Sequence, residues 1–194
     1  MKADDASIED LDAYLAAVAG AAAPDLATLI DAYDAIVIRE VVGRYPIRSV
    51  MDVPGFFDRI RRRVGGREVS LNELEKEWIL PTFHDARVHF ALNCGARSGP
   101  ALPTSALRAE GVDRTLDELT RAALARPDFV RIERGAVRVT RLFDWYRADF
   151  EHDGGTVAAF LHRYRADLPP DARLTYLTYD WRLNDAPAPG APRR

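Results

Sequence analysis

The sequence predicts an α+β protein: a single compact domain, residues 1–184, in which several helices pack on a small, mostly antiparallel sheet with two hairpins. Three observations support this class. Helix-like and strand-like patterns of apolar residues alternate along the chain. Two short apolar stretches are interrupted by Gly65-Gly66 and by Arg134-Gly135, which is typical of hairpin turns. The 194 residues are 47% hydrophobic, enough for a core that needs neither metal nor disulfide.

The composition argues against several classes of protein. The chain has 27 Lys+Arg and 30 Asp+Glu, a net charge of −3, so we expect no nucleic-acid partner. One cysteine cannot form an internal disulfide and the four histidines are scattered, so we expect no metal and no cofactor. The chain shows no signal-peptide pattern and no stretch of roughly 20 apolar residues that could cross a membrane. We therefore expect a cytoplasmic monomer or homodimer with no membrane partner.

Helices are predicted in the first third of the chain. Residues 7–10 resemble a helix start. From Leu26 to Arg44, apolar side chains recur every three or four residues, which predicts a mostly buried helix. Tyr45 ends this helix, because the residue before a proline disfavours the helical conformation. Residues 54–63, with a proline in the first turn, predict a short second helix.

The middle of the chain is predicted to add a hairpin, a helix and a strand. Residues 64–69 form the hairpin around the paired glycines. Ser70 and Glu73 have the spacing of a capping box, which predicts a helix that stops before Pro81. Residues 87–93 alternate apolar and polar side chains, which favours a half-buried strand, although so short a segment also allows a helical turn.

The last third is predicted to hold three helices, a second hairpin and a final strand. A capping box at Thr115 and Glu118 predicts a helix to about Ala125. The other predicted elements are strands 129–133 and 136–140, helices 142–150 and 156–164, and strand 173–181. Residues 185–194, rich in proline and alanine, have nothing to bury and are expected to form a disordered tail.

Five segments carry motifs that point to a family. They are residues 32–35 with 44–50, 70–75, 85–94, 143–150 and 179–184. In this order they resemble the motifs of the domain of unknown function 547 family, found in bacteria, plants and animals. The resemblance extends over nearly the whole chain and implies that family's fold. It also implies a relationship to papain-like or transglutaminase-like thiol enzymes with their elements in a rearranged order.

Two positions depart from the family's pattern. The family usually has a second cysteine in C-x-x-x-S-C-P, where this chain has Gly99. The family also has a histidine in I-E-H, where this chain has Lys76. Two of the groups on which a thiol mechanism in the family could depend are therefore missing here.

Cys94 is the candidate nucleophile, with His89 and Glu75 as further candidate catalytic groups. Cys94 follows the predicted strand and enters a loop in which Arg97 could favour the thiolate. His89 lies five residues earlier, so on an ideal strand the two side chains would lie on opposite faces unless the chain bends. The alternative for Cys94 is a buried structural thiol.

The loop after Cys94 could also bind a substrate without a covalent step. Its glycines let backbone N–H groups converge, Arg97 can hold an anion in a bidentate manner, and Ser98 offers a hydroxyl. We expect Asp31 and Tyr33, on the first long helix, to contribute to the same site. The alternative for Asp31 is a solvent-exposed position or an ion pair with an arginine.

Asp180 stands between two aromatic residues near the end of the chain and could serve as a polar anchor in a pocket. Together these candidates predict a small enzyme on a thiol-hydrolase-like or acyltransferase-like fold that acts on a small acyl or amide substrate, for example in a cyclisation step of specialised biosynthesis. In a covalent version Cys94 attacks and His89 is the base. In a non-covalent version Arg97 and Ser98 bind an anionic group while His89, Glu75 or Asp31 moves a proton. The alternative is a non-catalytic binding module that kept the fold.

Overall fold

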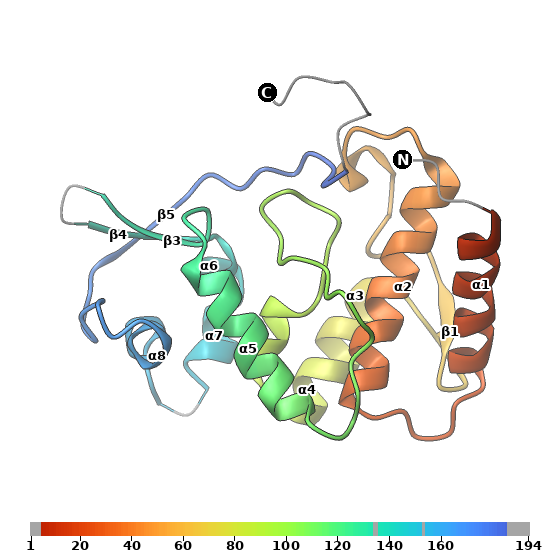
Figure 1. The fold of residues 1–194 in the computed structure, drawn as a ribbon, viewed down its shortest axis with the longest axis horizontal. Coiled ribbons are helices and arrows are strands. Elements are labelled where there is room, and N and C mark those ends of the chain that lie inside the picture. The colour runs from red at the N-terminus through yellow and green to blue at the C-terminus, as the bar shows by residue number, and fades with distance from the viewer. Residues whose placement is uncertain (1–4, 134–135, 153, 186–194) are drawn as a thin grey trace.

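Helices and short strands alternate along the residues that the computed structural model describes, 5–133, 136–152 and 154–185 (Figure 1). The α-helices are α1 (Asp5–Ala19), α2 (Leu26–Arg44), α3 (Leu71–Glu73), α4 (Leu80–Phe83), α5 (Val112–Ala125), α6 (Leu142–Trp145), α7 (Arg147–Phe150) and α8 (Val157–Tyr164). Two 3₁₀ turns, η1 (Val50–Asp52) and η3 (Ala86–Phe90), and a π-helical segment, η2 (Leu74–Ile79), complete the helical elements. The strands are β1 (Arg62–Val64), β2 (Arg67–Val69), β3 (Val130–Glu133), β4 (Ala136–Val139) and β5 (Leu174–Tyr176). The predicted α+β class is confirmed.

The longest of the described helices, α2, has the predicted bounds. Asp25 caps its start, since the carboxylate Oδ1 accepts a hydrogen bond from the Thr28 N–H at 2.8 Å. The helix ends at Tyr45 as predicted. It contacts α1, β1 and η2, so most of its circumference is covered. An apolar pattern that wraps around a helix is typical of such a buried position.

Two hydrophobic cores fill the domain. The first joins α1, α2, the β1–β2 hairpin, α3 and η2, and the second joins α6–α8 and the β3–β4–β5 sheet. In Figure 1 they occupy the right-hand and left-hand sides of the molecule, with α5 between them. Helix α5 contributes to both cores, because Leu116 is buried in the first core and Leu124 in the second.

The strands form two separate sheets. β1 and β2 pair antiparallel, with Arg62 opposite Val69, which confirms the first predicted hairpin. β3 and β4 also pair antiparallel, as predicted, and their connecting turn at 134–135 lies outside the described residues. β5 adds to β4 in parallel and completes a sheet in the order β3-β4-β5. It is shorter than the predicted strand 173–181, because the chain leaves the sheet after Tyr176.

The predicted helix at residues 54–63 is wrong. Residues 54–59 form turns, and the segment ends in β1. Gly55 has a φ of +76°, a left-handed conformation that interrupts a right-handed helix and that glycine adopts without steric strain. A proline in the first turn is compatible with a helix start but does not prevent this reversal.

The predicted strand at residues 87–93 is also wrong, because residues 86–90 form the 3₁₀ turn η3. Asp85 caps the turn, with its Oδ1 accepting from the Arg87 N–H at 2.9 Å. Val88 is buried in the first core and Phe90 in the second. With about three residues per turn, side chains two apart point in different directions. The alternating pattern therefore reflects burial in two cores and not one face of a strand.

The capping box at Ser70 is confirmed, but the end of its helix is not. The Ser70 N–H donates to the Glu73 carboxylate at 2.7 Å, and the Ser70 Oγ accepts from the Glu73 N–H at 3.2 Å. The helical path continues through η2 and α4 to Phe83 and does not stop before Pro81. Pro81 lies in the first turn of α4, where a missing N–H is tolerated.

Two helices in the second half also differ from prediction. Helix α5 begins at Val112 and not at a box around Thr115, whose hydroxyl donates to the Gly111 carbonyl at 3.2 Å. The predicted helix 142–150 is divided into α6 and α7 at Tyr146, whose φ of −114° and ψ of 28° are not helical. Helix α8 is confirmed, with Thr156 as its N-cap.

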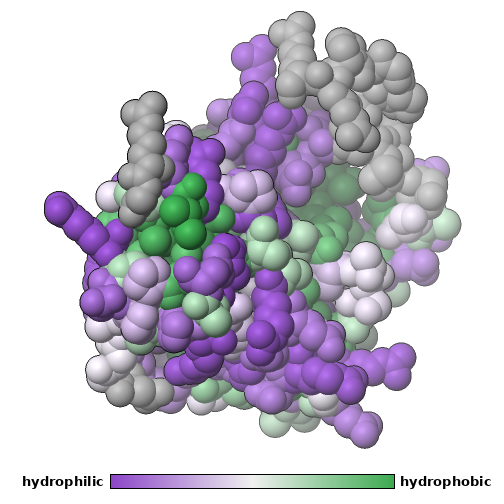
Figure 2. All heavy atoms as spheres, turned by 60° about the vertical axis from the view of Figure 1, so that its left-hand side comes forward, coloured by the Kyte–Doolittle hydropathy of each residue, from purple (hydrophilic) through white to green (hydrophobic). Residues whose placement is uncertain are grey.

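The surface is mainly hydrophilic on the face shown in Figure 2, with a compact hydrophobic area. Many arginines pair with neighbouring carboxylates, as Arg39 does with Asp12 and Arg165 with Asp167. Among the described residues, none of the helices has both the length and the apolar character needed to cross a membrane. The predicted tail from residue 186 onward lies outside the described residues.

Candidate functional site

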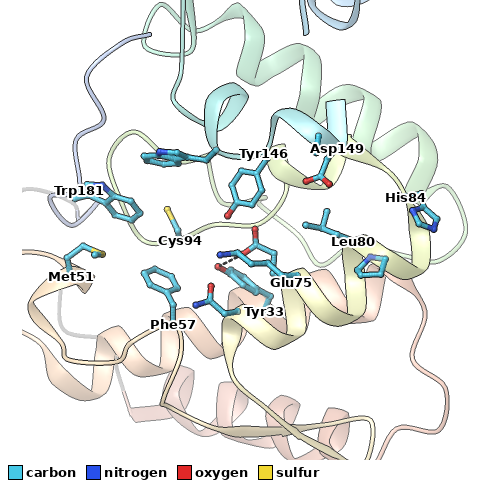
Figure 3. A pocket seen from close by; sticks show the side chains of 15 residues that line it. Tyr33, Met51, Phe57, Glu75, Leu80, His84, Cys94, Tyr146, Asp149 and Trp181 are labelled. Carbon is cyan, nitrogen blue, oxygen red and sulfur yellow. Dashed lines mark hydrogen bonds between the residues drawn. The ribbon is translucent and has the colours of Figure 1, made fainter. Parts of the chain in front are cut away.

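A cavity of about 740 Å³ opens between the two cores (Figure 3). Elements of the first core supply one side of it and elements of the second core supply the other. Its lining residues are Tyr33, Met51, Phe57, Asn72, Glu75, Lys76, Leu80, Pro81, His84, Cys94, Trp145, Tyr146, Ala148, Asp149 and Trp181. Of the candidates predicted from sequence, the cavity wall therefore contains Tyr33, Glu75 and Cys94.

Glu75 is a buried carboxylate held at the cavity wall by two phenols. It lies in η2, where the π-type turn is closed by a hydrogen bond from the Leu80 N–H to the Glu75 carbonyl. The Tyr33 hydroxyl donates to Glu75 Oε2 at 3.5 Å, and the Tyr146 hydroxyl points toward the same carboxylate, whose charge raises the pKa of Tyr146. Figure 3 shows both phenols pointing toward Glu75, one from each side of the cavity. The carboxylate is thereby fixed in orientation while one edge faces the cavity.

His89 lies behind this carboxylate and connects it to a second one. The His89 side chain is buried, and its Nε2 donates to Asp149 Oδ2 at 2.8 Å. Its other ring nitrogen, Nδ1, lies 4.0 Å from Glu75 Oε1, an electrostatic contact and not a hydrogen bond. The imidazole packs against the Tyr146 ring, with 4.0 Å between ring centroids. Asp149, His89 and Glu75 thus form a row that ends at the cavity.

The thiol of Cys94 faces the cavity but is not poised as a thiolate. Its Sγ lies 3.2 Å from the Tyr179 hydroxyl, which is its side-chain hydrogen-bond partner. Burial raises the pKa of Cys94, and the nearby Glu75 charge raises it further, while the bond with Tyr179 opposes the shift. A nucleophilic cysteine usually has a lowered pKa. The geometry therefore supplies a neutral thiol.

The phenols around the cavity are kept protonated. Burial is the main cause that raises the pKa of Tyr33, Tyr146 and Tyr179 well above that of an exposed tyrosine. The negative charge of Glu75 contributes to the rise in all three. A phenol that stays protonated is available as a hydrogen-bond donor to oxygen atoms that gain charge during a reaction.

The remaining predicted binding residues lie outside the cavity wall. Arg97 is exposed on the surface. Ser98 is buried, and its Oγ accepts a hydrogen bond from the Asp180 N–H at 2.9 Å, which joins the two loops that carry these residues. The Asp180 carboxylate pairs with Arg182 at 2.6 Å. Asp31 accepts from the Leu107 N–H at 2.9 Å. The contacts of Ser98, Asp180 and Asp31 hold loops in place, and the three side chains do not line the cavity.

Several cavity residues were not predicted from the sequence as site residues. Trp145, Tyr146 and Asp149 come from α6, α7 and the break between them, and Trp181 follows the last strand. The available signal was the resemblance of segments 143–150 and 179–184 to family motifs, which contain all four residues. The aromatic character of Trp145, Tyr146 and Trp181 alone suggested core positions, because large aromatic side chains are most often buried.

The described residues do not contain a group of three or more His, Cys, Asp or Glu side chains arranged to hold a metal ion. A second cavity, of about 710 Å³, lies on the other side of the loop that carries Cys94. Val37 and Val41 of α2, with Asn93 and Gly95 of the loop, form part of its mainly apolar wall. Cys94 faces the first cavity, so the loop separates two cavities of different chemistry.

Comparison with known proteins gives one match. A family model described as "Protein of unknown function, DUF547" matches residues 21–123, a little over half of the chain. The matched region contains Tyr33, Glu75, His89 and Cys94, while the cavity residues from α6 and α7 lie beyond it. No curated protein and no solved structure matches the chain.

Proposed function

The chain belongs to the DUF547 family, and we propose that it is an enzyme that performs acid–base chemistry on a small acyl or amide substrate. The observation that carries this proposal is the position of Glu75. A buried carboxylate that faces a cavity, next to a buried imidazole that a second cavity-lining carboxylate holds in place, has the arrangement of a general acid–base group with its support.

Each member of the row has a separate role. Glu75 accepts a proton from the bound substrate or attacking water and later returns it to the leaving group. His89 lies between two carboxylates, and the bond to Asp149 fixes its orientation, so its role is to position the row behind Glu75. Tyr146 and Tyr33 remain protonated and can donate hydrogen bonds to the carbonyl oxygen as negative charge develops there.

The non-covalent version fits this geometry better than the covalent one. Cys94 is hydrogen-bonded to Tyr179, and burial raises its pKa. His89 directs its two nitrogens toward Asp149 and Glu75, so neither is aimed at the thiol as a base. In the proposed reaction Cys94 is therefore part of the wall that holds the acyl group. An intramolecular acyl transfer that closes a ring is one reaction in this class.

The proposal is tested with a panel of small p-nitrophenyl esters and p-nitroanilides, assayed with the wild-type protein and three variants. Glu75→Gln keeps the size of the side chain but removes the base, and we expect kcat/KM to fall about 10²- to 10³-fold. Glu77→Gln is the matched control, because Glu77 is exposed on the same segment and does not line the cavity. Cys94→Ala should change kcat/KM only a few-fold.

Two results would contradict the proposal. Equal activity of the wild-type and Glu75→Gln proteins would remove Glu75 from catalysis, and loss of activity in Cys94→Ala would favour the covalent mechanism. A substrate-independent measurement supplements these assays. Iodoacetamide should modify Cys94 in the folded protein more slowly than it modifies free cysteine, because a thiol with a raised pKa has less of the reactive thiolate. Binding of panel compounds with no turnover would favour the non-catalytic binding module.

A further inference from the structure

One wall of the cavity is formed by aromatic rings. The ring centroids of Trp145 and Trp181 lie 5.8 Å apart, and Tyr179 lies 4.9 Å from Trp145 and 4.8 Å from Trp181. Phe57 extends the wall, with 6.4 Å between its ring centroid and that of Trp181. Trp145 is 44% exposed although it belongs to this cluster. Part of its ring therefore faces the cavity without a protein partner packed over it.

The cavity behind this wall carries negative charge. Glu75 is buried within it, and Asp149 lines its far end, where it is paired with His89. Lys76 also lines the cavity, but its side chain is exposed to solvent. After burial, the charge of Glu75 is the common cause that raises the pKa of Tyr33, Tyr146 and Cys94. An anionic group on a ligand would meet the same repulsion, whereas a cationic group would be stabilised.

We propose that the cavity recognises its substrate through an ammonium group, a protonated amine that lies between the Trp145–Trp181 wall and the Glu75 carboxylate. This inference rests on the proposed function and names the substrate class for the same site. The faces of tryptophan rings attract cations because of their electron-rich π-systems, and the attraction is stronger where water is excluded. Glu75 supplies the opposite charge. The volume of about 740 Å³ leaves room for the acyl or amide part of the same substrate.

The other classes of ligand fit these observations less well. A carboxylate or phosphate group would need a buried cation, and the ionisable acidic and basic groups of the described cavity wall, apart from phenols and the thiol, are Glu75, Asp149, the exposed Lys76 and His84 at the end opposite Trp181. A neutral planar ligand could stack on the indole rings, but it would leave the buried Glu75 without an opposite charge. An ammonium group can contact the indole rings and also pair with the Glu75 carboxylate.

The test compares three probes of similar size and shape: benzylammonium, benzyl alcohol and benzoate. Isothermal titration calorimetry at neutral pH and low salt gives their affinities for the full chain. We expect benzylammonium to bind about tenfold or more tightly than benzyl alcohol, because the two differ mainly in charge. Benzoate should bind more weakly than either.

Two variants locate the effect. Trp145→Leu keeps an apolar side chain but removes the ring, and Glu75→Gln keeps the shape but removes the charge. Each should reduce the preference for benzylammonium over benzyl alcohol several-fold. Trp78→Leu and Glu77→Gln are the matched controls, because Trp78 packs with Arg67 and neither control residue lines the cavity. Both controls should keep the wild-type preference.

Several outcomes would overturn the inference. They are equal affinity for benzylammonium and benzyl alcohol, tighter binding of benzoate, no binding of any probe at millimolar concentrations, or a preference unchanged in both Trp145→Leu and Glu75→Gln. The result is separable from the proposed function. Loss of turnover in Glu75→Gln without a preference for the cation would keep the acid–base mechanism and remove the ammonium group. A preference for the cation without turnover of any substrate would keep the recognition and remove the mechanism.

Discussion

The two hydrophobic cores on either side of the cavity are built from different side chains. The first is packed mainly by aliphatic residues, many of them on the single long helix α2. The second contains five buried phenylalanines on short elements: Phe90, Phe129, Phe143, Phe150 and Phe160. A long helix supplies many aligned apolar side chains, whereas helices of four residues supply few, so large rings must fill the second core. The cavity lies where these two kinds of packing meet.

The polar row of the site depends on how the two cores are joined. Glu75 belongs to the first core's elements and Asp149 to the second's. Between them, η3 places Val88 in one core and Phe90 in the other, so His89 is held at the junction. A shift of one core against the other would change the distances of 2.8 and 4.0 Å that connect the row. The difference between the cores is therefore relevant to the candidate chemistry and not only to stability.

The largest expected effect comes from a cavity in each core. Phe143 and Ile30 are both fully buried. Phe143→Ala should lower the free energy of unfolding by about 3–5 kcal/mol and Ile30→Ala by about 2–5 kcal/mol. Urea unfolding is followed by far-UV circular dichroism and by tryptophan fluorescence, which reports Trp145 and Trp181 at the junction and Trp78 beside the first core. If the cores form one cooperative domain, both signals should shift together in each variant.

A separate early transition in the Phe143→Ala variant, with the first core still folded, would contradict this expectation. It would mean that the second core unfolds independently and that the chain contains two cooperative units. The Ile30→Ala variant is the matched control, because it lowers the stability of the first core and shows whether any loss of stability separates the two signals. Coincident transitions in both variants would support the single domain.

A second prediction concerns Gly99, in the loop that follows Cys94 between the cores. A Cβ at Gly99 would lie 3.1 Å from the Cys94 Sγ. A sulfur attached to that Cβ is near enough to form a disulfide with the usual S–S length of about 2.05 Å. The Gly99→Cys variant should therefore lose its free thiols after mild oxidation and show two after reduction, as counted with Ellman's reagent in denaturant.

The control for this experiment is Ser105→Cys, which adds a thiol at an exposed position. It should retain two free thiols per chain under the same oxidation. Persistence of both thiols in Gly99→Cys would show that the loop moved when the side chain was added. The Ala96 carbonyl, which would lie 3.1 Å from the new Cβ, is the group most affected by such a movement.

The smallest expected effect concerns Asp34, which links the first core to the same loop. Its carboxylate is buried and accepts from the Asn93 N–H at 2.7 Å. Burial raises the pKa of Asp34 well above its usual value, although the bond from Asn93 opposes the shift. The neutral Asp34 carboxyl therefore makes its whole contribution to the free energy of unfolding at pH values below the unfolded-state pKa of about 3.9. This contribution is lost as the pH rises through the folded-state pKa.

Asp34→Asn keeps an oxygen acceptor and removes the charge, so it should stabilise the protein at neutral pH. We expect a gain of about 1 kcal/mol, or about 2–4 °C in Tm. The gain should shrink as the pH falls toward 4, where the wild-type carboxyl becomes neutral. Thermal unfolding at several pH values measures this. A variant that is less stable than wild type at pH 7 would show that the charged form is compensated in the fold.

Site residues were predictable from the sequence only where local sequence patterns carry the information. Glu75 and Cys94 were chosen from the sequence, and both lie at the cavity. Arg97 and Ser98 are predicted to bind substrate because a guanidinium can hold an anion and a hydroxyl can form a hydrogen bond, yet neighbours on a turning loop point in different directions, and neither residue lines the cavity. Asp149 lies sixty residues from His89 in the chain. A partner at that separation becomes apparent only when both cores are assembled.

Sequence patterns were sufficient to predict the elements that depend on neighbours in the chain. The bounds of α2, the capping box at Ser70 and the strands of both hairpins follow from apolar spacing, side-chain caps and turn-forming residues, all of which act over a few positions.

The conformation of residues 86–90 depends instead on tertiary packing. In isolation the pattern of Val88 and Phe90 is compatible with a strand or a turn, because either conformation can bury two apolar side chains. The presence of two cores selects the turn, since each side chain then has its own core to enter. The same arrangement brings Glu75, His89 and Asp149 into one row, and no local pattern in the sequence contains that proximity.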